Sequence, residues 1–210
     1  MKRALGAALA AALAACSSGL HSSAPAEQTY VLRAPNAAEQ GTTGNAHMRL
    51  RVLRPLAAPG LGSDRIALVA AGNRLDFLAA SRWAAPLPDM LEALAVEILA
   101  GSGGPWSIVE DSRGSLAADY FLQLSVRRFE ADYTQRPDVP TVHVELDCVL
   151  GRRDDGTVVA SFRAASTQDA MQNRVSSIVA AFEQAADTAL ASTAQRAAAA
   201  VKSATSPAPP

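Results

Sequence analysis

The sequence predicts an α/β sandwich, in which a mixed β-sheet is covered on its apolar side by two main helices. Several segments alternate apolar and polar residues, which is typical of half-buried strands, and two segments repeat apolar residues at helical spacing. The order along the chain is strands, helix, three or four strands, helix. One sheet with two helices packed on it would bury all of these apolar faces.

The strands before the first helix are predicted from short periodic runs. Residues 29–33 form a short extended run, and residues 48–53 alternate apolar side chains with arginines. Two further runs, 66–70 and 74–78, flank Gly72-Asn73. Glycine and asparagine tolerate the positive φ of a tight turn, so these two runs are predicted to form a hairpin.

The first helix is predicted over residues 87–100. Its apolar face consists of residues recurring at helical spacing: Leu87, Leu91, Leu94 and Ile98. Pro88 suits the first turn, and Asp89 and Glu92 suit the positive end of the helix dipole. The Gly-rich stretch 101–105 is expected to end the helix.

The second half of the chain predicts strands followed by a long helix. The strands are expected at 106–110, 119–130, 141–150 and 157–166, with a turn at Asp154-Asp155-Gly156 before the last one. The helix is expected over about 173–201. Its apolar face comprises Val175, Ile178, Val179, Phe182, Ala186, Ala189 and Leu190.

The N-terminus has the pattern of an export signal ending in a lipidation site. Lys2 and Arg3 precede an apolar stretch, 4–13, that is too short to span a bilayer. Leu13-Ala14-Ala15-Cys16 then has the form of a lipobox, so residues 1–15 are predicted to be a signal peptide and Cys16 the lipidated residue. An ordinary secretory signal with an incidental cysteine, or an Ala-rich helix, are the alternatives.

This interpretation divides the chain into four parts. After the signal peptide, residues 16–28 would be a flexible tether, 29–202 one domain, and 203–210 a disordered tail. Acyl chains on Cys16 would bind membrane lipid stably. Ser17, where Asp would favour retention in the inner membrane, resembles the residue of outer-membrane lipoproteins and implies a lipid-anchored domain on the periplasmic face of that membrane.

Composition restricts the partners and the chemistry. The net charge of −1 predicts no nucleic-acid partner. If Cys16 is acylated, Cys148 has no partner for a disulfide, and its place in an alternating strand predicts a buried core residue. Trp83 and Trp106, at element borders, are predicted to be packing residues.

Neither a catalytic residue nor a cofactor or metal site is predicted. His21, His47 and His143 lack the spacing of metal ligands and are expected to be exposed. Two basic pairs, Arg127-Arg128 and Arg152-Arg153, would suit lipid headgroups or an acidic partner, although solvated charges at strand ends explain them more simply.

Three stretches together resemble the ABC-type transport auxiliary lipoprotein family, which includes the lipoprotein of the paraquat-inducible Pqi operon. They are Tyr30-Val31-Leu32, the region 64–91 with Arg82-Trp83-Ala84-Ala85-Pro86-Leu87, and Asp119-Tyr120 with the strand that follows. The chain departs from the family at Ala58-Pro59-Gly60-Leu61, where Pro-x-Tyr-Leu is usual.

The resemblance implies a periplasmic, non-catalytic accessory of an ABC or MCE-type lipid transport system, with an MCE-type or permease subunit as its partner. One alternative is a lipoprotein that binds and activates an envelope-assembly or cell-wall enzyme. Direct ligand binding in a pocket between helices and sheet is less favoured, because the alternating pattern predicts a packed interior. An enzyme is least favoured, because nothing assembles a nucleophile, a base and an orienting group.

Overall fold

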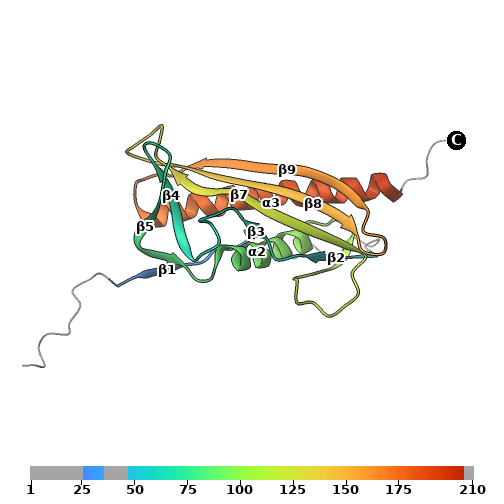
Figure 1. The fold of residues 1–210 in the computed structure, drawn as a ribbon. Helices are drawn as coiled ribbons and strands as arrows, with labels where there is room; N and C mark the ends of the chain where they lie inside the picture. Colours follow the sequence, from blue (N-terminus) through green and yellow to red (C-terminus); the bar gives the residue numbers. More distant parts are fainter. Residues whose placement is uncertain (1–25, 36–46, 206–210) are drawn as a thin grey trace, which may run out of the picture.

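The computed structural model describes residues 26–35 and 47–205, and it confirms the predicted fold class. A mixed sheet of nine strands packs against two helices in two layers (Figure 1). In chain order the elements are β1 (Gln28–Tyr30), β2 (Met48–Val52), β3 (Leu56–Ala57), β4 (Arg65–Ala70), β5 (Arg74–Trp83), α2 (Leu87–Gly101), β6 (Trp106–Glu110), β7 (Tyr120–Asp132), β8 (Thr141–Arg152), β9 (Val158–Asp169) and α3 (Val175–Thr205). No helix in these described ranges is both long and apolar enough to cross a bilayer.

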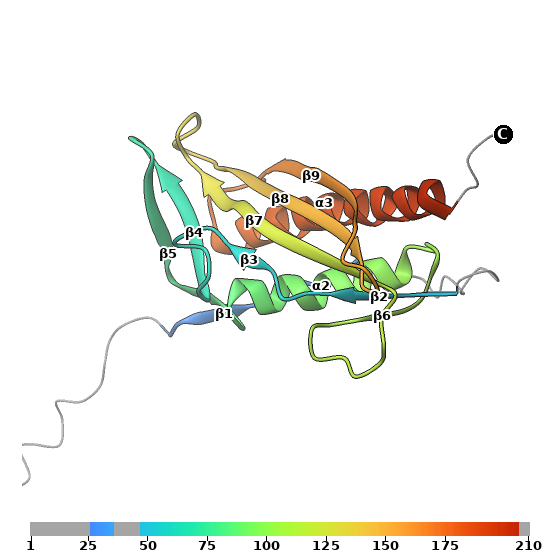
Figure 2. The same cartoon turned by 45° about the vertical axis from the view of Figure 1, so that its right-hand side comes forward.

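The long strand β7 organises the sheet. Along one side it pairs antiparallel with β8 over its whole length, and β9 pairs antiparallel with β8 beyond it. Along its other side β7 receives three strands in succession, β2, β3 and β4, all parallel to it. The strand β6 lies beyond β2, and β5 followed by β1 lies beyond β4 (Figure 2).

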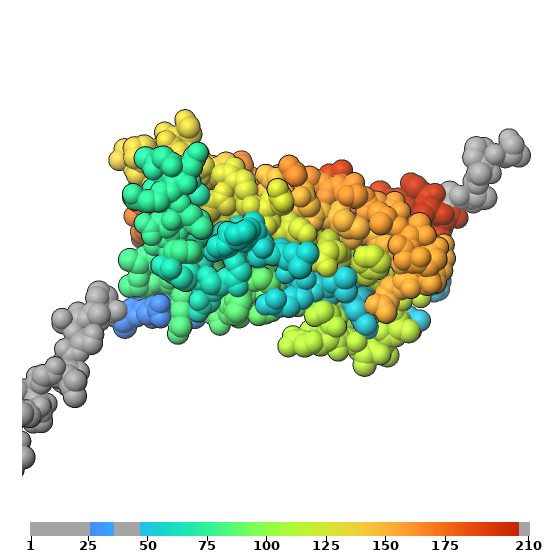
Figure 3. Space-filling model, in the orientation of Figure 1, coloured from blue at the N-terminus to red at the C-terminus, as the bar shows by residue number. Residues whose placement is uncertain are grey.

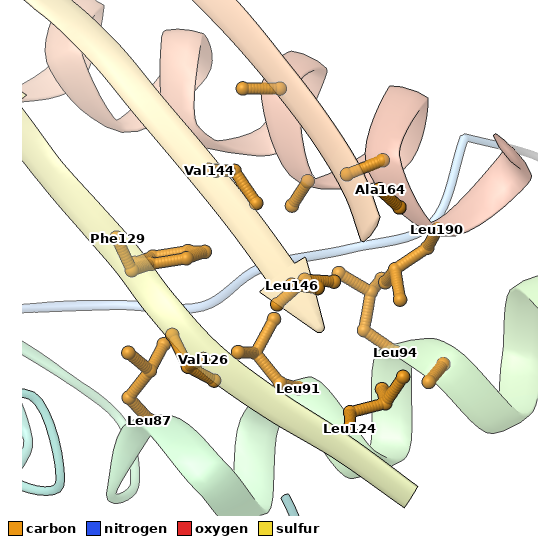
Figure 4. Packing of buried hydrophobic residues seen from close by; sticks show 14 of the residues in the cluster. Leu87, Leu91, Leu94, Leu124, Val126, Phe129, Val144, Leu146, Ala164 and Leu190 are labelled. Carbon is orange, nitrogen blue, oxygen red and sulfur yellow. The ribbon is translucent and has the colours of Figure 1, made fainter. Parts of the chain in front are cut away.

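The core lies between the inner face of the sheet and the two helices (Figure 4). The predicted apolar faces of β7 and β8 are confirmed, because every second residue is buried: Tyr120, Leu122, Leu124, Val126, Val142, Val144, Leu146, Cys148 and Leu150. Both tryptophans are buried as predicted. Trp83 packs edge-on against Phe182 of α3 and Phe129 of β7, with ring centroids 5.4 and 6.1 Å apart, so these rings join the hairpin, the sheet and a helix.

The β4–β5 hairpin turns where the sequence predicts it. Gly72 and Asn73 both have positive φ, +76° and +57°, in the short loop between the paired residues Ala70 and Arg74. The strand β5 nevertheless runs to Trp83, five residues past its predicted end at Leu78. The sequence pattern does not predict the last part of β5, because Ala80, with a φ of +49°, interrupts the alternation of side chains. After Ala80 the strand pairs with β1.

Several other boundaries differ from those predicted. The two-residue strand β3 is too short to show any periodicity, and its pairing with β7 depends on distant residues. Helix α3 continues to Thr205, three residues into the segment that the composition predicts to be a disordered tail. In α2, Leu99 is fully buried and Ile98 is half-buried, so the apolar face is rotated slightly from the predicted one.

Candidate functional site

The predicted lipidation site, Cys16, and the signal peptide before it lie outside the described residues, as does most of the predicted tether. The domain begins where β1 joins β5. The Ala84 amide donates to the Tyr30 carbonyl at 2.7 Å, and Arg82 pairs with Glu27 at 3.2 Å. The chain therefore enters the domain at one end of the long axis, opposite the end where α3 finishes (Figure 1).

The described histidine and cysteine side chains do not assemble a catalytic group. Cys148 is fully buried as predicted, and burial raises the pKa of its thiol, which disfavours the reactive thiolate. His143 is half-buried, contrary to the prediction that it is exposed, and its Nε2 lies 3.7 Å from Asp132 Oδ2. Burial lowers the pKa of His143, with a further contribution from Arg128. In the described ranges, no three His, Cys, Asp or Glu residues are placed to hold a metal ion.

The outer face of the sheet, which is turned away from the helices, carries salt-bridged side chains from β7, β8 and β9. Figure 3 shows one face of the molecule, on which segments from both halves of the chain lie side by side. A bulge at Arg127-Arg128 in β7 turns both guanidinium groups toward this face. Arg127 lies 3.6 Å from Asp147, and Arg128 lies 3.2 Å from Asp132. The pair is therefore in the middle of a strand and salt-bridged, whereas the sequence predicts solvated charges at a strand end.

Arg163 of β9 extends this network across the sheet. It contacts Glu145 at 2.9 Å and Asp147 at 2.8 Å, and its guanidinium lowers the pKa of Asp147. The acids and bases of the outer face are thus largely paired with each other. This gives a polar surface on which most charges are compensated, one that suits contact with a polar partner better than contact with lipid tails.

The strand β9 forms a long edge of the sheet. In the described part of the chain it pairs only with β8, and its exposed side chains alternate with half-buried ones. Arg196 of α3 covers this edge at Arg163, because its Nη1 donates to the Arg163 carbonyl at 2.7 Å. Its guanidinium also lies over the Phe162 ring. The edge between Ala164 and Thr167 carries small, uncharged side chains, which leaves it open to pairing with another strand.

A cleft of about 530 Å³ lies at the end of the molecule opposite β1, and we name it the distal cleft. Its charged lining includes Arg51 from β2, Asp119 before β7, and Arg152, Arg153 and Asp154 at the β8–β9 turn. Among these residues, the sequence offers only Arg152-Arg153 as a possible binding feature. Arg51 could have been noticed as part of the polar face of β2, but its meeting with Arg153 depends on the order of strands in the sheet.

A second, smaller cleft beside α2 is explained by local structure. Arg54 and Asp89 form a salt bridge of 2.6 Å, and buried Glu92 accepts a hydrogen bond of 2.6 Å from the Ser112 amide. Asp89 lies in the first turn of α2 as predicted. Glu92 instead fixes the loop between β6 and β7 to the helix, a contact that helix periodicity alone does not reveal.

Known proteins share both the sequence pattern and the fold. The family described as the ABC-type transport auxiliary lipoprotein component matches residues 30–198. A crystal structure of a Xanthomonas campestris protein superposes with a TM-score of 0.73 at 27% identity, covering 84% of this chain and 98% of that one. A structure of an uncharacterized protein gives a TM-score of 0.64 at 16% identity, covering 84% and 99% of the two chains. No curated protein matches the chain significantly.

Proposed function

Because the chain belongs to the ABC-type transport auxiliary lipoprotein family, we propose that it is a non-catalytic, lipid-anchored accessory of an MCE-type lipid transport system. The observation that carries this proposal is the family match over most of the chain, together with the lipobox that precedes the matched region. The buried thiol of Cys148 and the position of His143 beside Asp132 are consistent with a non-catalytic role.

The anchor is the acylated Cys16, and Ser17 directs the protein to the periplasmic face of the outer membrane. Residues 17–27 separate the lipid from β1, and eleven residues span at most about 40 Å when fully extended. The domain therefore remains within a few tens of ångströms of the membrane surface while it reaches into the periplasm. The end of α3 lies at the opposite end of the molecule from β1 (Figure 1), and Thr205 of α3 lines the distal cleft.

Docking to an MCE-type or permease subunit uses the β9 edge and the outer face beside it. An edge strand offers a partner strand main-chain hydrogen bonds, which give affinity without a deep pocket. Ala165 and Thr167 of β9 are exposed and small, so a partner strand meets little steric resistance there. The compensated charges on the outer face would then set which partner is accepted.

A photoreactive residue placed on the β9 edge tests this function in intact cells. The full chain carries the crosslinker at Ala165 or Thr167, with Gln184 on the exposed side of α3 as the control. Capture of a permease or MCE-type subunit from the edge positions, and not from Gln184, is the expected result. Capture of a cell-wall or envelope-assembly enzyme instead would assign the protein to the alternative function.

The anchor is tested separately by Cys16→Ser. The wild-type protein is expected to incorporate labelled palmitate and to sediment with outer membranes. The variant is expected to lose the label and to appear in the soluble periplasmic fraction. A Cys148→Ser variant is the matched control, because that thiol is fully buried and should leave labelling unchanged. Equal labelling of wild type and Cys16→Ser would refute lipidation at this residue.

A further inference from the structure

We propose that the distal cleft binds one phosphate-type anion through the guanidinium groups of Arg51 and Arg153. The cleft is formed by β2, the start of β7, the β8–β9 turn and the end of α3, so residues far apart in the sequence meet there. Its volume of about 530 Å³ lies in the range of small-ligand sites. The site is separate from the β9 edge, and the proposal does not depend on the proposed function.

Both acidic residues of the cleft are already engaged. The carboxylate of Asp119 accepts a hydrogen bond of 2.7 Å from the Arg49 amide and lies 3.8 Å from the Arg49 side chain. Asp154 takes two hydrogen bonds from Arg152, and this interaction lowers the pKa of Asp154 to about 2. Arg152 and Asp154 thus compensate each other, and neither acid is available to neutralise Arg153.

The two remaining arginines keep donors that lack partners. The backbone amide of Arg153 donates to the Asp119 carbonyl at 3.0 Å, which fixes its position on the rim. Its guanidinium group makes no ion pair in the described part of the chain and is exposed. Arg51 pairs with Glu110 through Nη2 at 3.3 Å and donates from the same atom to the Leu116 carbonyl, but its Nε is buried without a hydrogen-bond partner among the described residues.

An unpaired, desolvated donor on a cation is unfavourable unless an acceptor reaches it. The planar guanidinium fork matches the oxygens of a phosphoryl group, which can accept hydrogen bonds from two arginines at once. Five of the nine residues that line the distal cleft are charged, which favours an ionic ligand over an acyl chain. The matching ligand is therefore the phosphoryl group of a lipid headgroup or free phosphate.

Calorimetric titration of the purified full-length protein tests the site. One probe is inorganic phosphate, and the other is dihexanoyl phosphatidylglycerol below its micelle concentration. Arg153→Gln removes the exposed cation, and Arg174→Gln, at the other end of the molecule before α3, makes the same charge change as a control. We expect Arg153→Gln to weaken binding roughly tenfold, as the loss of one charge-assisted interaction implies, with Arg174→Gln unchanged.

The outcomes separate the two sources of the anion. Saturable binding of inorganic phosphate identifies free phosphate as a sufficient ligand, whereas binding of the lipid probe alone identifies the headgroup. Absence of saturable binding to both probes, or equal loss in Arg153→Gln and Arg174→Gln, would overturn the proposal. Because Arg51 is largely buried, Arg51→Gln is interpreted only with a thermal melt that matches the wild type.

Discussion

Asp187→Asn is expected to stabilise the protein at neutral pH. Asp187 lies on α3 where this helix approaches α2, and its Oδ1 atom is buried without a hydrogen-bond partner in the described part of the chain. Burial, together with the neighbouring carboxylates of Glu183 and Glu97, raises the pKa of Asp187 to about 6. The ionised form is therefore disfavoured in the folded state, and asparagine removes the charge at constant size.

The sign and the size of the effect follow from this pKa. The folded-state value lies above the ordinary value of 3.8, so Asp187 contributes stability that is fully present below about pH 4 and is lost as pH rises through about 6. A shift of this size corresponds to a ceiling of about 3 kcal/mol. Solvent screening of a half-buried carboxylate reduces this to about 1 kcal/mol.

Urea denaturation at pH 4 and pH 8 measures the difference. At pH 8 the variant should be more stable than the wild type by about 1 kcal/mol, and at pH 4 the two should coincide. Asp138→Asn, in the exposed loop between β7 and β8, is the matched control and should show no such gain. A gain of equal size at both pH values, or a loss at pH 8, would show that the charge of Asp187 is not unfavourable in the fold.

Three further changes test the packing and the backbone. Phe182→Ala should cost about 3–5 kcal/mol of unfolding free energy, because the ring is fully buried against two aromatic neighbours, and a lower urea midpoint measures this. Ala80→Gly should raise the free energy of unfolding by up to about 1 kcal/mol, since Ala80 has a positive φ, and a lowered urea midpoint would argue against strain there. Gly151→Ala should destabilise the sheet, because the added methyl group would lie 2.4 Å from the Phe121 ring; a thermal melt equal to that of the wild type would contradict this contact.

The sequence predicts the long elements well because their burial is periodic. Leu122, Leu124 and Val126 alternate with polar residues, and this pattern reports directly which side of β7 faces the helices. The β4–β5 turn is equally local, since Gly72 and Asn73 permit its backbone geometry whatever surrounds them. In such elements, burial and backbone geometry are determined by a few residues that are close in the sequence.

What the sequence does not predict depends on contacts between distant segments. The strand β3 exists because Leu56 lies beside Ser125, and two residues carry no pattern of their own. His143 has the sequence context of an exposed strand residue, yet the side chains of Asp132 and Arg128 partly cover it. The distal cleft is missed for the same reason, because Arg51 and Arg153 meet only after the strands have been ordered.

The arrangement around β7 constrains the order in which the chain can fold. During synthesis β2, β3 and β4 emerge long before β7, and Arg49 and Asp119, which are hydrogen-bonded in the final structure, are 70 residues apart. Until β7 is available, β3 has no strand to pair with, β4 can pair only with β5 and β2 only with β6, so nothing joins these strands into one sheet. Such distant pairings fold slowly, so the N-terminal half is the part of a nascent chain that most needs protection from aggregation.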